Sequence, residues 1–312
     1  MTELRAFTTV YSYYLPEVRA AISDLVAAYP HDVFLRSVTP AGLDTFHEPI
    51  LEQLVAAHAR DVPGLGAFPY RYPTAGSEEG IREFMTRLAT AGERRLYMWA
   101  GDYEGYREVA RTRGMETVEV ERDADPSTLA AGPWFLSNPS ARDGNIVPAA
   151  EVQALAEAGH QVFYDLSYLG STDPAVYDVS HPNVTAVALS FSKTFGLFYY
   201  RIGFLFTREP VPALYANKWF KNVLSLLIAE RVMRLDAGAL ALKYKGLQKA
   251  VLDDLNREHG LSLQASDAFL LAHLTDAGAS SLAPESRAVL DRYRRHHGYR
   301  LCLTPYFVER AG

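Results

Sequence analysis

Residues 187–206 place a lysine and an arginine between two apolar segments, and this arrangement most constrains what the chain can fold into. The first segment ends in Ser190-Phe-Ser-Lys193, and Arg201 directly precedes the second segment, residues 202–206. Both segments have strand-like sequence, so both cations are expected near the core, where a buried charge needs a partner or a function.

A lysine in apolar surroundings loses proton affinity and becomes an amine nucleophile of the kind that forms Schiff bases. An arginine keeps its charge and suits a phosphate group. With the hydroxyls of Ser190 and Ser192 close by, Lys193 and Arg201 predict a pocket for a phosphorylated aldehyde. The alternative is a buried lysine whose amine extends to the surface at a strand end.

Length, charge and cysteine content narrow the class of protein. The 312 residues are enough for one large domain and a smaller one. A formal net charge of −6 without a basic run disfavours nucleic acid as a partner. The single cysteine, Cys302, leaves no internal disulfide and fits a reducing compartment. Without a signal segment or an apolar run of membrane-spanning length, we expect a cytoplasmic protein with no membrane contact.

Polar residues follow three predicted strands at regular intervals. Asn138, Asp165 and Lys193 come at or just after strands 133–137, 161–166 and 184–189, and they are 27 and 28 residues apart. Such intervals are typical of strand–helix–strand units, and open α/β sheets bind ligands at the carboxyl ends of their strands. The pattern therefore predicts an α/β fold, a mainly parallel sheet flanked by helices, with the site at this end.

The lysine segment also carries a family resemblance. Ser190-Phe-Ser-Lys-Thr-Phe-Gly-Leu followed by Arg201-Ile-Gly resembles the lysine segment of the class I/II, fold type I, pyridoxal-phosphate enzymes, the aspartate aminotransferase family. The resemblance implies pyridoxal 5′-phosphate bound to Lys193 as a Schiff base, with Ser190, Ser192 and Arg201 around the phosphate. It also implies a homodimer, in which the N-terminal arm lends Tyr11, Tyr13 or Tyr14 to the neighbouring subunit.

A second phosphate contact is expected before a helix. Gly76-Ser77 follows a short strand candidate, 68–72, and begins a helix with apolar residues on one face. The free N–H groups and the positive dipole end of such a helix suit an anion. The alternative is simple capping by Ser77. The family's glycine-rich phosphate turn has the same place in the chain, and the resemblance assigns Gly76, Ser77 and the Glu78 backbone to the phosphate.

The resemblance also implies contacts to the cofactor ring. Asp165 would keep the pyridine nitrogen protonated, because a nearby anion favours the protonated form and makes the ring a better electron sink. Asn138 and Tyr168 would bind the phenolic oxygen, Asn138 would also contact the substrate, and Tyr103 would stack on the ring. The chain departs from the family at Gly101-Asp102, where a proline is usual, and at Leu166, where the family has an acidic residue.

Some of these residues also have a structural interpretation. Asn138-Pro139 is a common turn, and Asp165 on its own is an ordinary strand-end aspartate. We expect Asp102 and Glu104 to be solvated and Tyr106 to pack on its helix.

The C-terminal part is expected to form a smaller α+β domain. Arg300 lies in a strand candidate resembling the family strand whose arginine binds the substrate α-carboxylate, a task that suits a planar guanidinium. An edge-strand surface arginine is the alternative. The predicted organisation is an N-terminal arm and helix (1–40), a large cofactor-binding domain (41–235) and a small domain (236–312).

Two further groups of residues were weighed. His296-His297 are expected at the end of a last helix opened by Pro284, where adjacent side chains face apart and do not share a metal. Arg36, Arg71 and the N-terminal tyrosines are candidates for contacts to the substrate side chain.

The resemblance implies an enzyme that acts on the α-amino group of an amino acid. The leading hypothesis is an aminotransferase, in which Lys193 removes the α-proton and a 2-oxo acid is formed. One alternative is a β/γ-eliminating lyase or a cyclase acting on a specialised amino acid. The other is a non-catalytic ligand-binding protein on the same fold.

Overall fold

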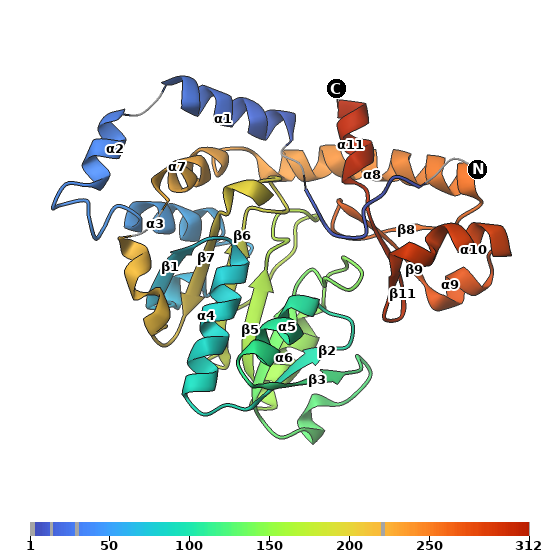
Figure 1. The fold of residues 1–312 in the computed structure, drawn as a ribbon, viewed down its shortest axis with the longest axis horizontal. Helices are drawn as coiled ribbons and strands as arrows, with labels where there is room; N and C mark the ends of the chain where they lie inside the picture. Colours follow the sequence, from blue (N-terminus) through green and yellow to red (C-terminus); the bar gives the residue numbers. More distant parts are fainter. Residues whose placement is uncertain (1–3, 13–14, 29–30, 220–221, 312) are drawn as a thin grey trace.

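The computed structural model describes residues 4–12, 15–28, 31–219 and 222–311 (Figure 1). Tyr13 and Tyr14 lie outside these residues. Within them, no helix is both long and apolar enough to cross a membrane.

A seven-stranded sheet, the large sheet, forms the centre of the fold. Its strand order is β1-β7-β6-β5-β4-β2-β3, and every neighbouring pair is parallel except the two that involve β7. The predicted mainly parallel α/β sheet is therefore confirmed. The strands are β1 (Tyr70–Thr74), β2 (Arg95–Trp99), β3 (Glu116–Val120), β4 (Pro133–Ser137), β5 (Gln161–Leu166), β6 (Val184–Ser190) and β7 (Gly203–Thr207).

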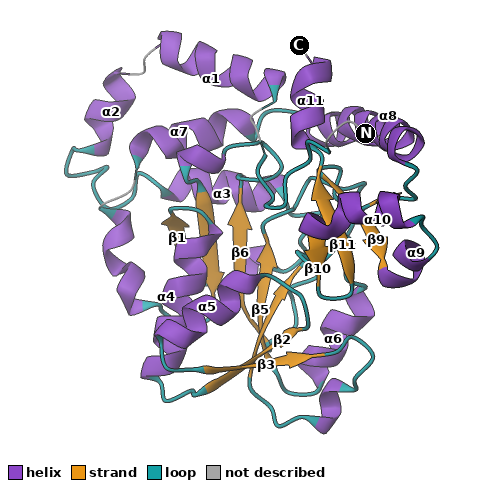
Figure 2. Ribbon diagram, turned by 45° about the vertical axis from the view of Figure 1, so that its right-hand side comes forward, coloured by secondary structure: helices purple, strands orange, loops and turns teal. Residues whose placement is uncertain are grey.

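Helices cover both faces of the large sheet, because its strands carry apolar side chains on both sides. In β2, Leu96 and Met98 pack with α4 (Ser77–Thr90) and α5 (Glu104–Thr112), whereas Tyr97 and Trp99 belong to the core that includes α6 (Ala149–Glu157). Figure 2 shows these helices around the twisted strands. The core that includes α6 also contains apolar side chains of α1 (Pro16–Ala28), α3 (Glu48–Ala57), α7 (Val223–Val232) and α8 (Ala237–His259).

A separate four-stranded antiparallel sheet, the C-terminal sheet, follows α8, in the order β10-β11-β9-β8. The N-terminal arm lies beside it, because Phe7 pairs with Cys302. The strands and helices that follow α8 are β8 (Gln264–Ala265), β9 (Leu271–Thr275), α9 (Asp276–Ser280), α10 (Pro284–Leu290), β10 (Arg294–Arg295), β11 (Gly298–Cys302) and α11 (Thr304–Ala311). The proposed domain boundaries stay a prediction.

The remaining described elements are short. They are α2 (His31–Ser37) and the 3-10 helices η1 (Leu65–Ala67), η2 (Pro126–Thr128), η3 (Phe198–Tyr200), η4 (Pro212–Lys218) and η5 (Asp291–Tyr293).

Two local predictions were wrong. The helix opened by Pro284 ends at Leu290, and the chain then forms the β10–β11 hairpin instead of continuing in helix. Gly298 permits this hairpin, because a Cβ at that position would lie 2.4 Å from the Leu274 carbonyl oxygen. Ser77 is not the cap of α4: Gly76 is the N-cap residue, and Ser77 is the first helical residue.

Candidate active site

Strand register brings the phosphate-turn residues and the lysine segment to one end of the large sheet. Gly203, at the start of β7, pairs with Thr74 of β1 on one side and with Ser190 of β6 on the other. The contact is close, because a Cβ on Gly203 would lie 2.5 Å from the carbonyl carbon of Gly76. The turn before α4 and the end of β6 therefore face the same space.

Arg201 completes this group. Its Nη2 donates a hydrogen bond of 2.8 Å to the Ala75 carbonyl, and a Cβ on Gly76, whose φ is +80°, would lie 2.6 Å from the same nitrogen. The hydroxyls of Ser190 and Ser192 are 3.0 Å apart. The Arg201 guanidinium, the N-terminus of α4 and two hydroxyls form one group of hydrogen-bond donors, and this set fits a phosphate group. Any side chain at Gly76 would collide with the Arg201 guanidinium.

Asp165 lies at the end of β5 and is held by three donors. Its Oδ2 accepts from the Tyr106 hydroxyl at 2.9 Å, and its Oδ1 accepts from the Ser167 backbone N–H at 3.0 Å and from the Ser167 hydroxyl. Burial raises the pKa of Asp165, and these hydrogen bonds lower it in part. The fixed carboxylate suits a protonated ring nitrogen.

Lys193 reaches the same cavity from the end of β6. Its amine donates to the Val10 carbonyl of the N-terminal arm and lies 6.0 Å from the centre of the Tyr168 ring. Burial lowers the pKa of Lys193 to about 8, and it raises the pKa of the Tyr168 phenol. A lysine of this kind has a substantial fraction of free amine near neutral pH, as a nucleophile or a base requires.

The loop after β2 also lines the cavity, and the predicted solvation of Asp102 is wrong. Asp102 is buried and accepts hydrogen bonds from Ser137 N at 3.1 Å, from the Ser137 hydroxyl and from Tyr103 N at 2.7 Å. Burial raises the pKa of Asp102 to about 6. This network fixes the loop that presents Tyr103, whose hydroxyl donates to Glu78 at 3.3 Å.

Two arginines enter the cavity from the C-terminal sheet. Arg300 of β11 donates to the Ala141 carbonyl, and both Arg300 and Arg295 of β10 donate to the Thr8 carbonyl. The Nε atoms of both arginines are buried without a hydrogen-bond partner among the described residues. Burial lowers the pKa of Arg295, and the Arg300 charge adds to this effect. Two adjacent cations with free donor capacity fit an anionic ligand.

These groups enclose a cavity of about 420 Å³. It collects most of the site residues predicted from the sequence: Ser77, Glu78, Tyr103, Asp165, Tyr168, Ser190, Ser192, Lys193, Arg201 and Arg300. Gly76 adjoins the cavity next to Arg201. Tyr11 also lines the cavity of its own chain, where its ring packs on Phe198.

Three candidates lie elsewhere. The Asn138 side chain is buried and donates to the Val147 carbonyl at 3.0 Å and the Tyr164 hydroxyl at 2.7 Å. Its Oδ1 accepts from the Val147 N–H, so the structure does not bring this amide into the cavity. Arg71 donates to the carbonyls of Phe68 and Gly66, and Arg36 lines a different cavity.

Sequence reasoning missed Tyr106, Asp102 and Arg295. Tyr106 lies three residues after Tyr103 on α5, but the packing of this helix on the large sheet, which brings its hydroxyl to Asp165, is not local. Arg295 was missed because the helix opened by Pro284 was predicted to continue through this residue. Alternation along a strand would have placed it on a face of the C-terminal sheet.

Comparisons with known proteins agree with this geometry. A family model, aminotransferase class I and II, matches residues 43–286. A threonine-phosphate decarboxylase from a Sinorhizobium species is 30% identical over 206 residues, 61% of each chain. A histidinol-phosphate aminotransferase from Methanococcoides burtonii is 29% identical over 139 residues, 40% of this chain and 38% of that protein. The matched part thus spans less than two thirds of either relative.

The fold has a clear counterpart among solved structures. Histidinol-phosphate aminotransferase from Sinorhizobium meliloti, solved with pyridoxal-5′-phosphate, has a TM-score of 0.68 at 18% identity, over 94% of this chain and 84% of that one. The family match also supports pyridoxal phosphate, the cofactor predicted from the sequence. The chain belongs to the aminotransferase class I and II family.

Proposed function

We propose that this protein is a pyridoxal-phosphate enzyme that acts on the amino group of an amino acid, with transamination as its reaction. The observation that carries the proposal is the shared cavity of Lys193, Asp165 and Arg201. These are the nucleophile, the ring-nitrogen partner and the phosphate partner that the cofactor needs. When bound, the cofactor supplies an electron sink for charge that develops at the substrate α-carbon.

The residues of the chain would then divide the work. Arg201, Ser190, Ser192 and the start of α4 hold the phosphate. Asp165 keeps the proton on the ring nitrogen, and Tyr106 and Ser167 keep Asp165 in place. The Lys193 amine accepts the α-proton, because its lowered pKa leaves it partly unprotonated near neutral pH.

The two arginines from the C-terminal sheet favour a substrate with two anionic groups. Arg300 has the place that the family resemblance gives to the α-carboxylate partner, and Arg295 lies beside it in the same cavity. A second carboxylate or a phosphate ester suits Arg295. The names of both curated relatives contain a phosphate, and this supports a phosphorylated amino compound as the substrate class.

Decarboxylation is the second candidate. The relative with 30% identity is a threonine-phosphate decarboxylase, so the same cavity on this family scaffold is compatible with loss of the α-carboxylate. The homodimer and the cytoplasmic location stay predictions.

The test is a product analysis of the purified, cofactor-loaded protein with O-phosphothreonine, O-phosphoserine, histidinol phosphate, aspartate and threonine. Transamination predicts a 2-oxo acid from the amino acids, or a ketone from histidinol phosphate, together with aminated cofactor. Decarboxylation predicts carbon dioxide and an amine. If no compound in the panel reacts, although the cofactor is bound to Lys193, the proposed activity is rejected.

A pair of arginine variants tests the substrate class. Arg295→Gln should raise KM for the phosphorylated compounds by about tenfold or more, since a charge-assisted hydrogen bond contributes about 1.5–3 kcal/mol. Arg294→Gln is the matched control, because Arg294 pairs with Asp276 and is absent from the cavity wall. Equal KM values for the two variants would contradict a role for Arg295.

A further inference from the structure

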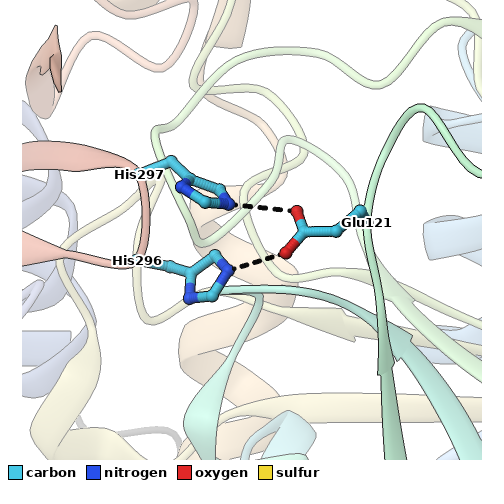
Figure 3. A group of neighbouring side chains, drawn as sticks. All are labelled: Glu121, His296 and His297. Atoms are coloured by element: carbon cyan, nitrogen blue, oxygen red, sulfur yellow. Dashed lines mark hydrogen bonds and ion pairs between the residues drawn. The ribbon is translucent and has the colours of Figure 1, made fainter.

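A side-chain cluster outside the active-site cavity brings two adjacent histidines together. Arg295 pairs with Gly298 in the β10–β11 hairpin, so His296 and His297 form its two-residue turn. Figure 3 shows both rings directed at Glu121, which directly follows β3 of the large sheet. The sequence prediction that these rings face apart was wrong, because it assumed a helix.

The cluster has the dimensions of a metal site. His296 Nε2 is 3.0 Å from Glu121 Oε1, and His297 Nε2 is 3.0 Å from Oε2. The three potential ligand atoms lie within 4.8 Å of one another, and no other such group occurs in the part of the chain that the structure describes. Donors of a tetrahedral zinc ion, each about 2.0–2.2 Å from the metal, are roughly 3.3–3.6 Å apart. Only small side-chain shifts are therefore needed.

We propose that Glu121, His296 and His297 bind a divalent zinc-type cation. Two imidazole nitrogens and one carboxylate suit zinc, whereas calcium and magnesium prefer oxygen ligands alone. All three side chains are substantially exposed, so water can occupy the fourth position. This site is independent of the proposed enzyme activity.

The protons in the cluster are compatible with the metal. Each imidazole now donates its Nε2–H to the carboxylate. An exposed glutamate is ionised at neutral pH. A bound cation takes the place of the two Nε2 protons, and each neutral ring then carries its proton on Nδ1.

The metal would fasten the C-terminal sheet to the large sheet beside the active-site cavity. The hairpin already touches the loop after β2, where a Cβ on Gly101 would lie 2.7 Å from the Cβ of His296. That loop continues into Asp102 and Tyr103, and the hairpin carries Arg295, all of which line the cavity. The cation thus links two walls of the cavity that come from different sheets.

The first test is equilibrium dialysis of the tag-free holoenzyme against Zn²⁺, with metal analysis. We expect one equivalent that is lost or weakened by at least about tenfold in His297→Ala and in Glu121→Gln. His181→Ala is the matched control, because His181 lies in the loop before β6 and does not belong to the cluster. Thermal unfolding of each variant verifies that it is folded. If His297→Ala does not fold, Glu121→Gln alone provides the test.

Hydrogen exchange tests whether the bound metal clamps the β10–β11 hairpin to the large sheet. Zn²⁺ should slow amide exchange in residues 294–300 of the wild-type holoenzyme, and it should not do so in Glu121→Gln. If the variants bind as much Zn²⁺ as the wild type, or if the wild type binds none, the site is refuted. Binding at the cluster without slower exchange would refute the clamp.

Discussion

Tyr106 provides the sharpest test of how the site is built, because it touches Asp165 but not the cavity. Its hydroxyl donates to Asp165 Oδ2 at 2.9 Å, and the whole side chain is 0% exposed. A hydrogen bond to a charged group contributes about 1.5–3 kcal/mol. This hydrogen bond lowers the pKa of Asp165, so Tyr106→Phe should raise that pKa.

With a higher pKa, the Asp165 carboxylate competes more strongly for the proton that it shares with the ring nitrogen, so the ring nitrogen is protonated less. We expect the kcat of Tyr106→Phe to fall by about ten- to a hundredfold, with little change in KM, because Tyr106 does not line the cavity. Nitrogen NMR of a cofactor labelled at the ring nitrogen measures the protonation directly and needs no substrate.

Tyr164→Phe is the matched control. Tyr164 is also buried and hydrogen-bonded, but its partner is Asn138. Tyr164→Phe should lose about 1 kcal/mol of unfolding free energy, and Tyr106→Phe, whose hydroxyl bonds a charged group, should lose about 1.5–3 kcal/mol. Only Tyr106→Phe should change the ring-nitrogen signal and kcat. If the two variants have the same signal and the same kcat, Tyr106 is only a packing residue and the reasoning fails.

Two further predictions concern the lysine and the phosphate cradle. Because burial lowers the pKa of Lys193 to about 8, the rate at which the apoprotein binds pyridoxal phosphate should rise with pH up to about 8 and then level off; stopped-flow absorbance measures this, and a rise that continues through pH ~10 contradicts it. Gly76→Ala should weaken cofactor binding by about tenfold or more, because the new Cβ meets the Arg201 guanidinium. Gly92→Ala has a similar positive φ with no atom within 4 Å, so it should share the backbone strain but keep the cofactor affinity, as cofactor titration would show.

Local sequence patterns predicted most of the large sheet. Strands β4 and β5 have the predicted bounds, and β6 extends one residue beyond them, because each is a short, largely apolar run between turn residues. Parallel-sheet geometry placed Asn138, Asp165 and Lys193 at one end of the sheet, since the carboxyl ends of parallel strands lie at one edge, whereas the glycine turn was assigned by the family resemblance.

The missing parts depend on contacts between distant segments. Asp102 is buried because Ser137 of β4 lies beside the loop after β2, and no local pattern reports this. The amide of Asn138 turns toward Val147 because the loop folds back on itself. The β10–β11 hairpin was mistaken for helix because a run of charged residues has no periodicity that separates the two.

The cavity wall is made from both ends of the chain. The lysine amine is hydrogen-bonded to Val10, and the arm that carries Val10 is attached through Phe7 to Cys302. During synthesis on the ribosome, residue 302 emerges after every strand of the large sheet, the last of which ends at Thr207. The active site therefore closes after the large sheet can form, and a nascent chain with a finished large sheet still lacks a complete cofactor pocket.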